Sequence, residues 1–539
     1  MSPPPTAPPT PTTEPAADRR LRVVSGSTAD GDAVLALLDG TPIRVVLPTA
    51  PAWRHQVLAL ALVDLLGRLF PLITIDCDSA ASAHPLLPPG PPLLRPRLEE
   101  AAGHGALGRT RPPGAPPITI IVGDAVADGP IVGPVVHVDG AGWQSYNGTT
   151  PPRWPDRDWP MVPVGPLAAA CRAAAQATAA ALHPVSGAQV PPASAYASAL
   201  THTASPDPID DGHAGSAGAW QNPAISAVMA GAGSIGGAAA YALAMTPSLA
   251  GTLTVTDPQQ LEDKNLDRAL LATAQTTAQR LWKVDAVQRA LDHHEALRVD
   301  TYRGTLTDWV ASHPEPFPLP LVLTAVDSRQ ARTAVQDCLP LDVVNAACHP
   351  DEITVSGHRT GTGPCLCCLH MEQVMDTTTT RARLLERATG LNGRMILHYL
   401  TADIPLEADV LRQIERHRGL PPESLSQYEN ATLEDLRAGE LLYGATAVGT
   451  PTGTVAVAAP YVTALAGVLL AAEALKSATP ALAGYRLGPD GGHIKYEERV
   501  QRGPLQALLT SPPRWAGSEC LCQSSRRQRL LTTRYATFG

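Results

Sequence analysis

The stretch from Ala227 to Asp257 contains residues whose types and spacing could bind a nucleotide. An apolar run ends in a turn with glycines at 231, 233 and 236, an alanine-rich helix pattern follows, and a second β-like run ends at Asp257. Gly231 permits a tight turn, Gly233 lets backbone N–H groups approach a phosphate, and Gly236 lets helix and strand pack closely. Asp257 is placed to hold ribose hydroxyls. The pattern favours a nucleotide site over a glycine turn without a ligand, and leaves the nucleotide open.

More charged and polar residues follow this unit. Asn265 and Arg268 lie in a short loop, Lys283 lies on a helix expected over 273–297, and a strand over 320–326 ends at Asp327. Ligands of open α/β sheets lie at the carboxyl edge of the strands, where Asp327 is expected. Only four of the 41 basic residues are lysines, so Lys283 is a distinctive residue type here. A solvated cation on a helix face is the alternative reading for Lys283.

Five of the nine cysteines form two tight clusters. Cys365 and Cys368 form a C-x-x-C pair with Cys367 between them, and Cys520 and Cys522 lie near the C-terminus. Four thiolates can close a tetrahedral shell around a structural zinc ion. This usage favours a metal site in a reducing cytoplasm over a secreted disulfide framework, with free thiols or a redox pair as alternatives.

Length and composition limit the other classes of function. A chain of 539 residues is too long for one core and predicts two or three domains. The net charge of -9 gives no reason to expect nucleic acid, and no uninterrupted apolar run reaches membrane-spanning length. Residues 1–20 are rich in Pro and Thr and predict a disordered tail, with no export signal after it. We therefore expect a cytoplasmic protein.

The chain divides into two α/β units with Rossmann-like open sheets. In the first, residues 21–200, strand patterns at 43–47, 72–76, 118–123 and 135–138 alternate with an amphipathic stretch at 53–70 and a helix at 165–182. Pro48 and Pro51 replace the phosphate-binding glycines, so this unit should not bind a nucleotide in the same way. Residues 201–222 predict a linker.

The second unit covers residues 223–500. It includes a mostly helical insert at about 370–440, a small-residue helix over 455–476 and a closing hairpin over 485–500. Residues 501–539 form a C-terminal segment with the second cysteine pair.

The second unit resembles the ThiF/MoeB/HesA-type adenylating enzymes of the ubiquitin-activating superfamily. The resemblance covers roughly residues 223–525 and rests on several motifs in matching order. These are GAGSIGG (231–237), TVTD (254–257), Asn265-Leu266-x-Arg268, Lys283, the strand ending in Asp327, Pro364-Cys365-x-x-Cys368, the helix at 459–476 and the late cysteine pair.

The resemblance implies that a carboxylate attacks the α-phosphate of ATP, forming an acyl-adenylate and releasing pyrophosphate. It implies that the carboxylate is the C-terminus of a small protein or peptide. The implied roles are phosphate binding by Gly231, Gly233 and Gly236, ribose binding by Asp257, charge stabilisation by Asn265, Arg268 and Lys283, and positioning of Mg²⁺ by Asp327. It also implies that an early and a late cysteine pair share Zn²⁺, although the C-x-C spacing of the late pair and the extra Cys367 depart from the family pattern.

The resemblance also implies an interpretation of the first unit. Its segment 163–182 looks like a decayed copy of the helix at 455–476, so we expect a degenerate, inactive copy of the second unit. Family sites are typically completed across a two-fold-like pair, and a fused copy would supply that pair within one chain, compatible with a monomer. Arg19, Arg20 or Arg22 could supply a cross-domain arginine.

Family members that capture the acyl group on a thiol carry a cysteine after the first zinc pair, whereas residues 369–475 contain none. Cys338 and Cys348 are expected to be buried structural residues. We therefore expect transfer to an external nucleophile, such as an amine, a sulfur carrier or the thiol of a separate acceptor protein. Two alternatives stay open. One is a non-catalytic nucleotide-binding scaffold, favoured by Gln259 where the family usually has a second acid. The other is an NAD- or FAD-dependent oxidoreductase.

Overall fold

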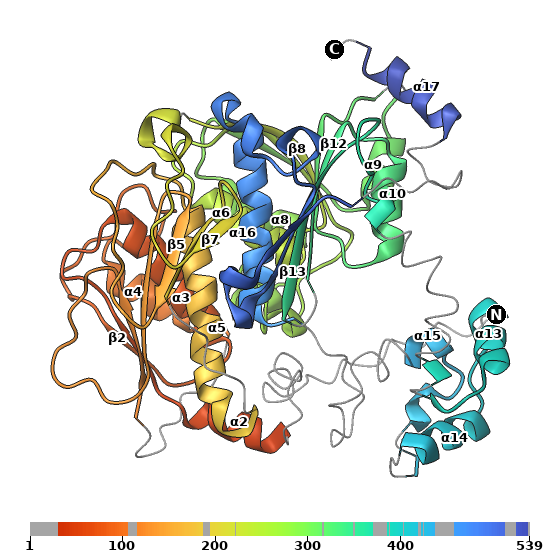
Figure 1. Ribbon diagram of the computed structural model, residues 1–539, viewed down its shortest axis with the longest axis horizontal. Coiled ribbons are helices and arrows are strands. Elements are labelled where there is room, and N and C mark those ends of the chain that lie inside the picture. The colour runs from red at the N-terminus through yellow and green to blue at the C-terminus, as the bar shows by residue number, and fades with distance from the viewer. Residues whose placement is uncertain are drawn as a thin grey trace, which may run out of the picture.

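The computed structural model describes residues 31–105, 116–186, 194–220, 222–314, 317–348, 351–369, 385–386, 389–402, 404–418, 422–423, 425–436, 458–512 and 524–536. Two large sheets, one from each half of the chain, are separated by packed helices (Figure 1). Among the described helices, none combines the length and the apolar character that crossing a bilayer requires. Arg19, Arg20, Arg22, Cys520 and Cys522 lie outside the described residues.

The first sheet has seven strands in the order β2-β1-β3-β4-β5-β6-β7. Strands β1 to β4 pair in parallel, and β5, β6 and β7 extend the sheet in antiparallel fashion. The strands are β1 Ile43–Val46, β2 Ile73–Asp76, β3 Ile118–Val122, β4 Val135–Ala141, β5 Gln144–Gly148, β6 Ala195–Ser198 and β7 Thr203–Ser205. The helices are α2 Gly31–Gly40, α3 Trp53–Gly67, α4 Leu94–Ala102 and α5 Val164–Ser186.

The second sheet has eight strands in the order β10-β9-β8-β11-β12-β13-β14-β15. Strands β8 to β12 pair in parallel, and β13 to β15 are antiparallel. The strands are β8 Ala224–Ala230, β9 Ala250–Thr256, β10 Leu297–Tyr302, β11 Leu321–Thr324, β12 Asp342–Cys348, β13 Glu352–Arg359, β14 Lys495–Arg499 and β15 Leu508–Thr510. The helices are α6 Ser234–Ala244, α7 Ala274–Ala278, α8 Lys283–Leu291, α9 Leu306–Ala311, α10 Arg329–Asp337, α16 Pro460–Ser477 and α17 Ser525–Arg534.

The two sheets share one plan of connections. Strand β1 lies between β2 and β3 in the first sheet, as β8 lies between β9 and β11 in the second. In each sheet the last parallel strand, β4 or β12, leads into three antiparallel ones. Helix α3 follows β1 as α6 follows β8, and α5 separates β5 from β6 as α16 separates β13 from β14. Strand β10 is the extra member of the second sheet. This correspondence supports the interpretation of the first unit as a copy of the second, which stays a prediction.

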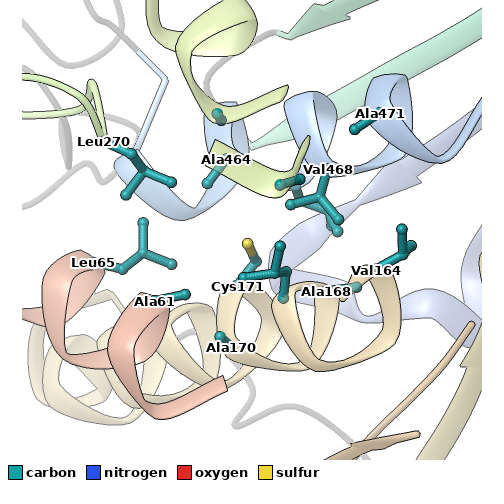
Figure 2. Packing of buried hydrophobic residues seen from close by; sticks show 14 of the residues in the cluster. Ala61, Leu65, Val164, Ala168, Ala170, Cys171, Leu270, Ala464, Val468 and Ala471 are labelled. Carbon is teal, nitrogen blue, oxygen red and sulfur yellow. The ribbon is translucent and has the colours of Figure 1, made fainter. Parts of the chain in front are cut away.

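Helix α5 of the first unit packs against α16 on one side and α3 on another, and one continuous apolar core spans both units. Figure 2 shows small side chains facing across this interface, including Ala61, Ala168, Cys171, Ala464 and Val468. The small residues let the helices approach closely. A Cβ added at Gly467 of α16 would lie 2.4 Å from the carbonyl oxygen of Ile235 on α6. Since α6 follows the glycine turn, this close packing fixes the element that carries the candidate site.

The insert forms helices α13 Gly393–Ala402, α14 Ala408–Arg418 and α15 Leu433–Leu436. These helices surround their own apolar cluster, which includes Leu391, Ile396 and Ile414. This cluster is separate from the core that the two sheets share, and Figure 1 draws the helices apart from the sheets. The insert is therefore a small helical module.

Several local expectations were wrong. The segment 273–297 forms two helices, α7 and α8, and its last residue begins β10. No hairpin forms over 485–500, because β14 pairs with β13 on one side and β15 on the other. Part of the expected linker forms β7. Helix α3 is buried almost all round rather than amphipathic, because helices cover it on several sides.

Candidate functional site

The glycine turn joins β8 to α6 at the carboxyl edge of the second sheet. Gly231 has a φ of +94°, and its N–H donates to Thr256 O at 2.9 Å. A Cβ added at Gly231 would lie 2.9 Å from Ala325 O, and one at Gly236 would lie 2.0 Å from Gly231 O. Glycine is therefore required at both positions, at Gly231 by the left-handed backbone and at Gly236 by backbone contact.

Gly233 differs, since no heavy atom lies within 4 Å of the place where its Cβ would be. It is the N-cap residue of α6 and offers no side-chain cap to the helix. The first N–H groups of a helix lack internal partners and attract anions. The open space and the uncapped helix end fit a bound phosphate group.

Asp257 directly follows β9 and lies beside this turn. Its Oδ2 accepts a hydrogen bond from Ala232 N at 2.8 Å, and its Oδ1 accepts one from Gln259 N at 2.8 Å. Each carboxylate oxygen can accept a further hydrogen bond. The side chain is therefore fixed in one orientation by the backbone and still has acceptor capacity for ribose hydroxyls.

The loop after β9 brings Arg268 to the start of α6. Its Nε donates to Ser234 Oγ at 3.2 Å, and its guanidinium also lies 3.7 Å from Asp267. Ser234 is the first residue of α6, so the cation lies where the helix attracts anions. Asn265 is placed differently: its Oδ1 accepts from Glu262 N at 2.9 Å and closes a local turn. The side-chain oxygen of Asn265 therefore stabilises the turn at the start of this loop.

Lys283 is the first residue of α8 and is only 8% exposed. Its Nζ donates to Gln259 Oε1 at 2.5 Å. Burial lowers the pKa of the ammonium group, and the negative charges of Asp257 and Asp327 oppose that shift. Gln259, where the family usually has an acid, thus holds the lysine through a neutral amide.

Asp327 follows β11 and is exposed. Arg332, one turn into α10, donates from Nη2 to Val326 O at 2.9 Å, and its buried Nε has no partner among the described residues. Burial lowers the pKa of Arg332, and Cys348 and Asp327 oppose the shift. Arg332 was not included in the expected site; its spacing after Asp327 was the available signal.

Cys348, expected as a buried structural residue, is partly exposed at the carboxyl end of β12. Burial raises the pKa of its thiol to about 11, although Arg268 and Arg332 act in the opposite direction. A thiol with this pKa is protonated at neutral pH and is a weak nucleophile. Cys338 is buried, as expected.

Cys365 and Cys368 lie in a turn after β13, and both are buried. Their sulfur atoms are 3.7 Å apart. Two thiolates on a tetrahedral zinc ion, with Zn–S bonds of about 2.3 Å, lie roughly 3.8 Å apart. His358 Nδ1 donates to Pro364 O at 2.9 Å and supports this turn. The described residues contain no cluster of three or more metal-ligating groups, and the late cysteine pair lies outside them. Zinc binding therefore stays a prediction.

The parallel sheet edge, the glycine turn and the uncapped helix define a Rossmann-like nucleotide-binding protein. The ThiF family matches residues 218–502, just over half of the chain. The chain therefore belongs to the ThiF family, and the resemblance to ThiF/MoeB-type adenylating enzymes is confirmed.

Individual relatives are more distant. An uncharacterized protein, y4jF, of Sinorhizobium fredii is 26% identical over 277 residues, which cover 48% of this chain and 50% of the relative. The chain thus spans about half the length of that relative. Among solved structures, E. coli MccB with MccA-N7isoASN is 14% identical with a TM-score of 0.34, covering 56% of this chain and 67% of that one. E. coli MccB with ATP is 13% identical with a TM-score of 0.32, covering 56% and 66%.

Proposed function

We propose that this protein uses ATP to adenylate a carboxylate. The observation that carries the proposal is the open, uncapped N-terminus of α6 at Gly233, with Arg268 beside it in a ThiF-family chain. One carboxylate oxygen attacks the α-phosphorus and forms a new P–O bond. The bond from that phosphorus to the bridging oxygen breaks, and pyrophosphate leaves with the electron pair. The products are an acyl-adenylate and pyrophosphate.

The residues around α6 supply what this reaction needs. Both reactants are anionic, so fixed cations and N–H groups that act on the phosphates lower the barrier. Arg268 and the start of α6 would bind the phosphates, Lys283 would neutralise charge that develops on them, and Asp257 would hold the ribose. Asp327 is the carboxylate that would hold Mg²⁺, which neutralises phosphate charge when bound. Its exposure at the sheet edge fits an acidic ligand to a metal–nucleotide complex.

The substrate in this proposal is the C-terminal carboxylate of a small protein or peptide, as the family resemblance implies. The acyl-adenylate then passes to an external nucleophile. The raised pKa of Cys348 supports this route, because a protonated thiol would not compete for the acyl group. Formation of a reducible thioester that is lost in Cys348→Ala would contradict it.

The same proposal assigns the cysteine pairs to one structural zinc ion in a reducing cytoplasm, and the first α/β unit to a degenerate copy. The 3.7 Å separation of the Cys365 and Cys368 sulfurs supports the first assignment. The shared strand order and the prolines at 48 and 51 support the second. Such a copy would make one chain a built-in pseudo-dimer.

A non-catalytic scaffold is the second candidate, because Gln259 replaces an acid beside Lys283. Two measurements separate the readings. Calorimetric titration with MgATP, NAD⁺ and FAD should give binding to MgATP alone, and binding to NAD⁺ or FAD alone would indicate an oxidoreductase. ATP–pyrophosphate exchange is then measured with pools of peptides that have free C-termini. Exchange that disappears in Asp327→Ala supports adenylation, whereas MgATP binding without exchange for any pool favours the scaffold.

A further inference from the structure

Arg68 of the first unit reaches into the second unit at the loop that carries Asn265 and Arg268. It lies directly after α3, and its side chain is completely buried. Its Nη1 donates to Leu266 O at 2.8 Å, and its Nη2 lies 3.4 Å from Leu270 O and 3.3 Å from Ala272 O. A single guanidinium group thus contacts three carbonyls of one loop. Carbonyl oxygens in a buried place need such donors.

Residues of the first unit fix the orientation of the Arg68 side chain. Its Nε donates to Asp64 Oδ1 at 2.7 Å, and His104 Nδ1 contacts the other carboxylate oxygen at 2.6 Å. A Cβ added at Gly67 would lie 2.1 Å from Ala102 O, so the end of α4 packs directly on the turn that presents Arg68. The pair with Asp64 also balances the charge that Arg68 brings into the interior.

The loop is held by an apolar contact as well. Leu65 of α3 and Leu270 of the loop belong to the core that spans both units, and Figure 2 shows their side chains facing each other. Residues 266–272 therefore rest on α3 through a leucine pair and the guanidinium of Arg68. The other side of the same loop presents Arg268 to Ser234 at the start of α6.

We propose that Arg68 is a positioning residue through which the first unit holds the 265–272 loop in the shape that binds ATP. The inference rests on the proposed function. Arg68 does not contact the nucleotide in this scheme; it acts through the loop that places Arg268. The first unit would thereby contribute to the active site although its own turn lacks the phosphate-binding glycines.

The test must separate positioning from folding. Removing Arg68 alone would leave Asp64 buried with only His104 as a partner and would destabilise the protein. We therefore use the double variant Asp64→Leu with Arg68→Met, which replaces the ion pair by apolar side chains of similar size, a change that buried pairs often tolerate. The matched control is Arg172→Met with Glu498→Leu, another buried ion pair between the units, which joins α5 to β14 and not to this loop. Arg68→Lys keeps the charge and serves as the conservative variant.

The probes are MgATP, titrated by calorimetry, and amide hydrogen exchange of residues 266–272 without nucleotide. We expect the Asp64/Arg68 double variant to raise the Kd for MgATP by about tenfold or more and to speed exchange in the loop, because small displacements of binding groups are costly. The control should keep the wild-type Kd within about twofold. Arg68→Lys should lie between, since the three donors of one ammonium group cannot serve Asp64 and all three carbonyls at once.

The proposal would be overturned if the Asp64/Arg68 double variant kept the wild-type Kd for MgATP and the wild-type exchange rates of the loop. It would also be overturned if the Arg172/Glu498 control changed both quantities as much as that variant does. If the double variant does not fold, Arg68→Lys decides: an unchanged Kd and unchanged loop exchange refute positioning. If the wild-type protein does not bind MgATP, the proposed function fails. The exchange comparison still decides whether Arg68 orders the loop, so the two failures are distinguishable.

Discussion

Arg172 of α5 and Glu498 of β14 form a buried, two-pronged ion pair that joins the two α/β units. Arg172 Nε lies 2.8 Å from Glu498 Oε1, and Nη2 lies 2.7 Å from Oε2. Ser145 accepts a further bond from Arg172, and Tyr496 donates to Glu498. Each side-chain nitrogen of Arg172 and each carboxylate oxygen of Glu498 thus has a hydrogen-bond partner. Removing either residue would leave the charge of the other one buried without its counterion.

Breaking this pair on one side should destabilise the protein. We expect Glu498→Gln to lower the free energy of unfolding by about 3–5 kcal/mol, because it leaves the Arg172 charge buried without a counterion. Urea denaturation followed by circular dichroism measures the change. Arg172→Met with Glu498→Leu should cost far less, and equal losses in both proteins would contradict this explanation.

Substitutions at two glycines of the turn should have separate effects, one on the stability of the protein and the other on its affinity for MgATP. We expect Gly236→Ala to destabilise the protein by about 1–3 kcal/mol, because its Cβ would lie 2.0 Å from Gly231 O. Gly233→Ala should leave the melting temperature nearly unchanged, since its Cβ would enter open space, but should weaken MgATP binding. Thermal melting and calorimetry on both variants test this. Unchanged MgATP affinity in Gly233→Ala would mean that no phosphate occupies that space.

Lys283 should matter for the reaction more than for the fold. We expect Lys283→Met to lower the rate of ATP–pyrophosphate exchange by roughly 10²-fold, because a fixed cation near the phosphates is removed. Lys495, which pairs with Glu497 on β14, is the control, and Lys495→Met should exchange at the wild-type rate. An equal loss in the two variants would assign Lys283 no special role.

A buried cluster of ionisable side chains between the units should lower the free energy of unfolding as the pH falls. His202 contacts Glu473 and Lys476 of α16, and His493 and Tyr496 also face it. Burial lowers the pKa of His202 and Lys476 adds to the shift, whereas Glu473 opposes it. Burial alone would raise the pKa of Glu473, but Lys476 and His202 outweigh it and lower the value to about 2. Both folded-state pKa values lie below the unfolded ones, so both contributions are present at higher pH and are lost as pH falls.

The contribution of His202 to the free energy of unfolding should disappear as pH falls below 6.5. The contribution of Glu473 should disappear between pH 4.5 and about 2. Each unit of pKa depression corresponds to about 1.4 kcal/mol. The comparison is the difference in melting temperature between pH 8 and pH 5 for the wild type and His202→Asn. Asparagine suits the φ of +57° at this position. We expect a smaller pH effect in the variant, and an equal effect would remove His202 as its source.

The cysteine pairs predict one zinc ion per chain. We expect elemental analysis of the purified protein to give a zinc ratio near one, and chelation to lower the melting temperature. Cys365→Ser and Cys520→Ser should each lose the metal, whereas Cys171→Ser, a buried cysteine of α5, should keep it. Full zinc content in Cys520→Ser would remove the late pair from the ligand set.

Local sequence patterns predicted the glycine turn and the parallel strands other than β10. The strand ending at Asp257 and the helix starting after Gly233 are local elements, because their patterns depend on neighbouring residues alone. Strands β5, β6, β7, β10, β13 and β15 were missed. Strands β5 and β6 are buried throughout and no residue of β13 is exposed, so these strands show little of the polar alternation that marks a half-exposed strand.

The sequence by itself determined the nucleotide unit from Gly231 to Asp257, because glycine geometry and a following acid act within one strand–helix–strand segment. Only the tertiary structure placed Arg68 against Leu266, 198 positions apart in the chain. It also paired Arg172 with Glu498. No periodicity encodes such contacts, because they depend on how two separate sheets and their helices pack together.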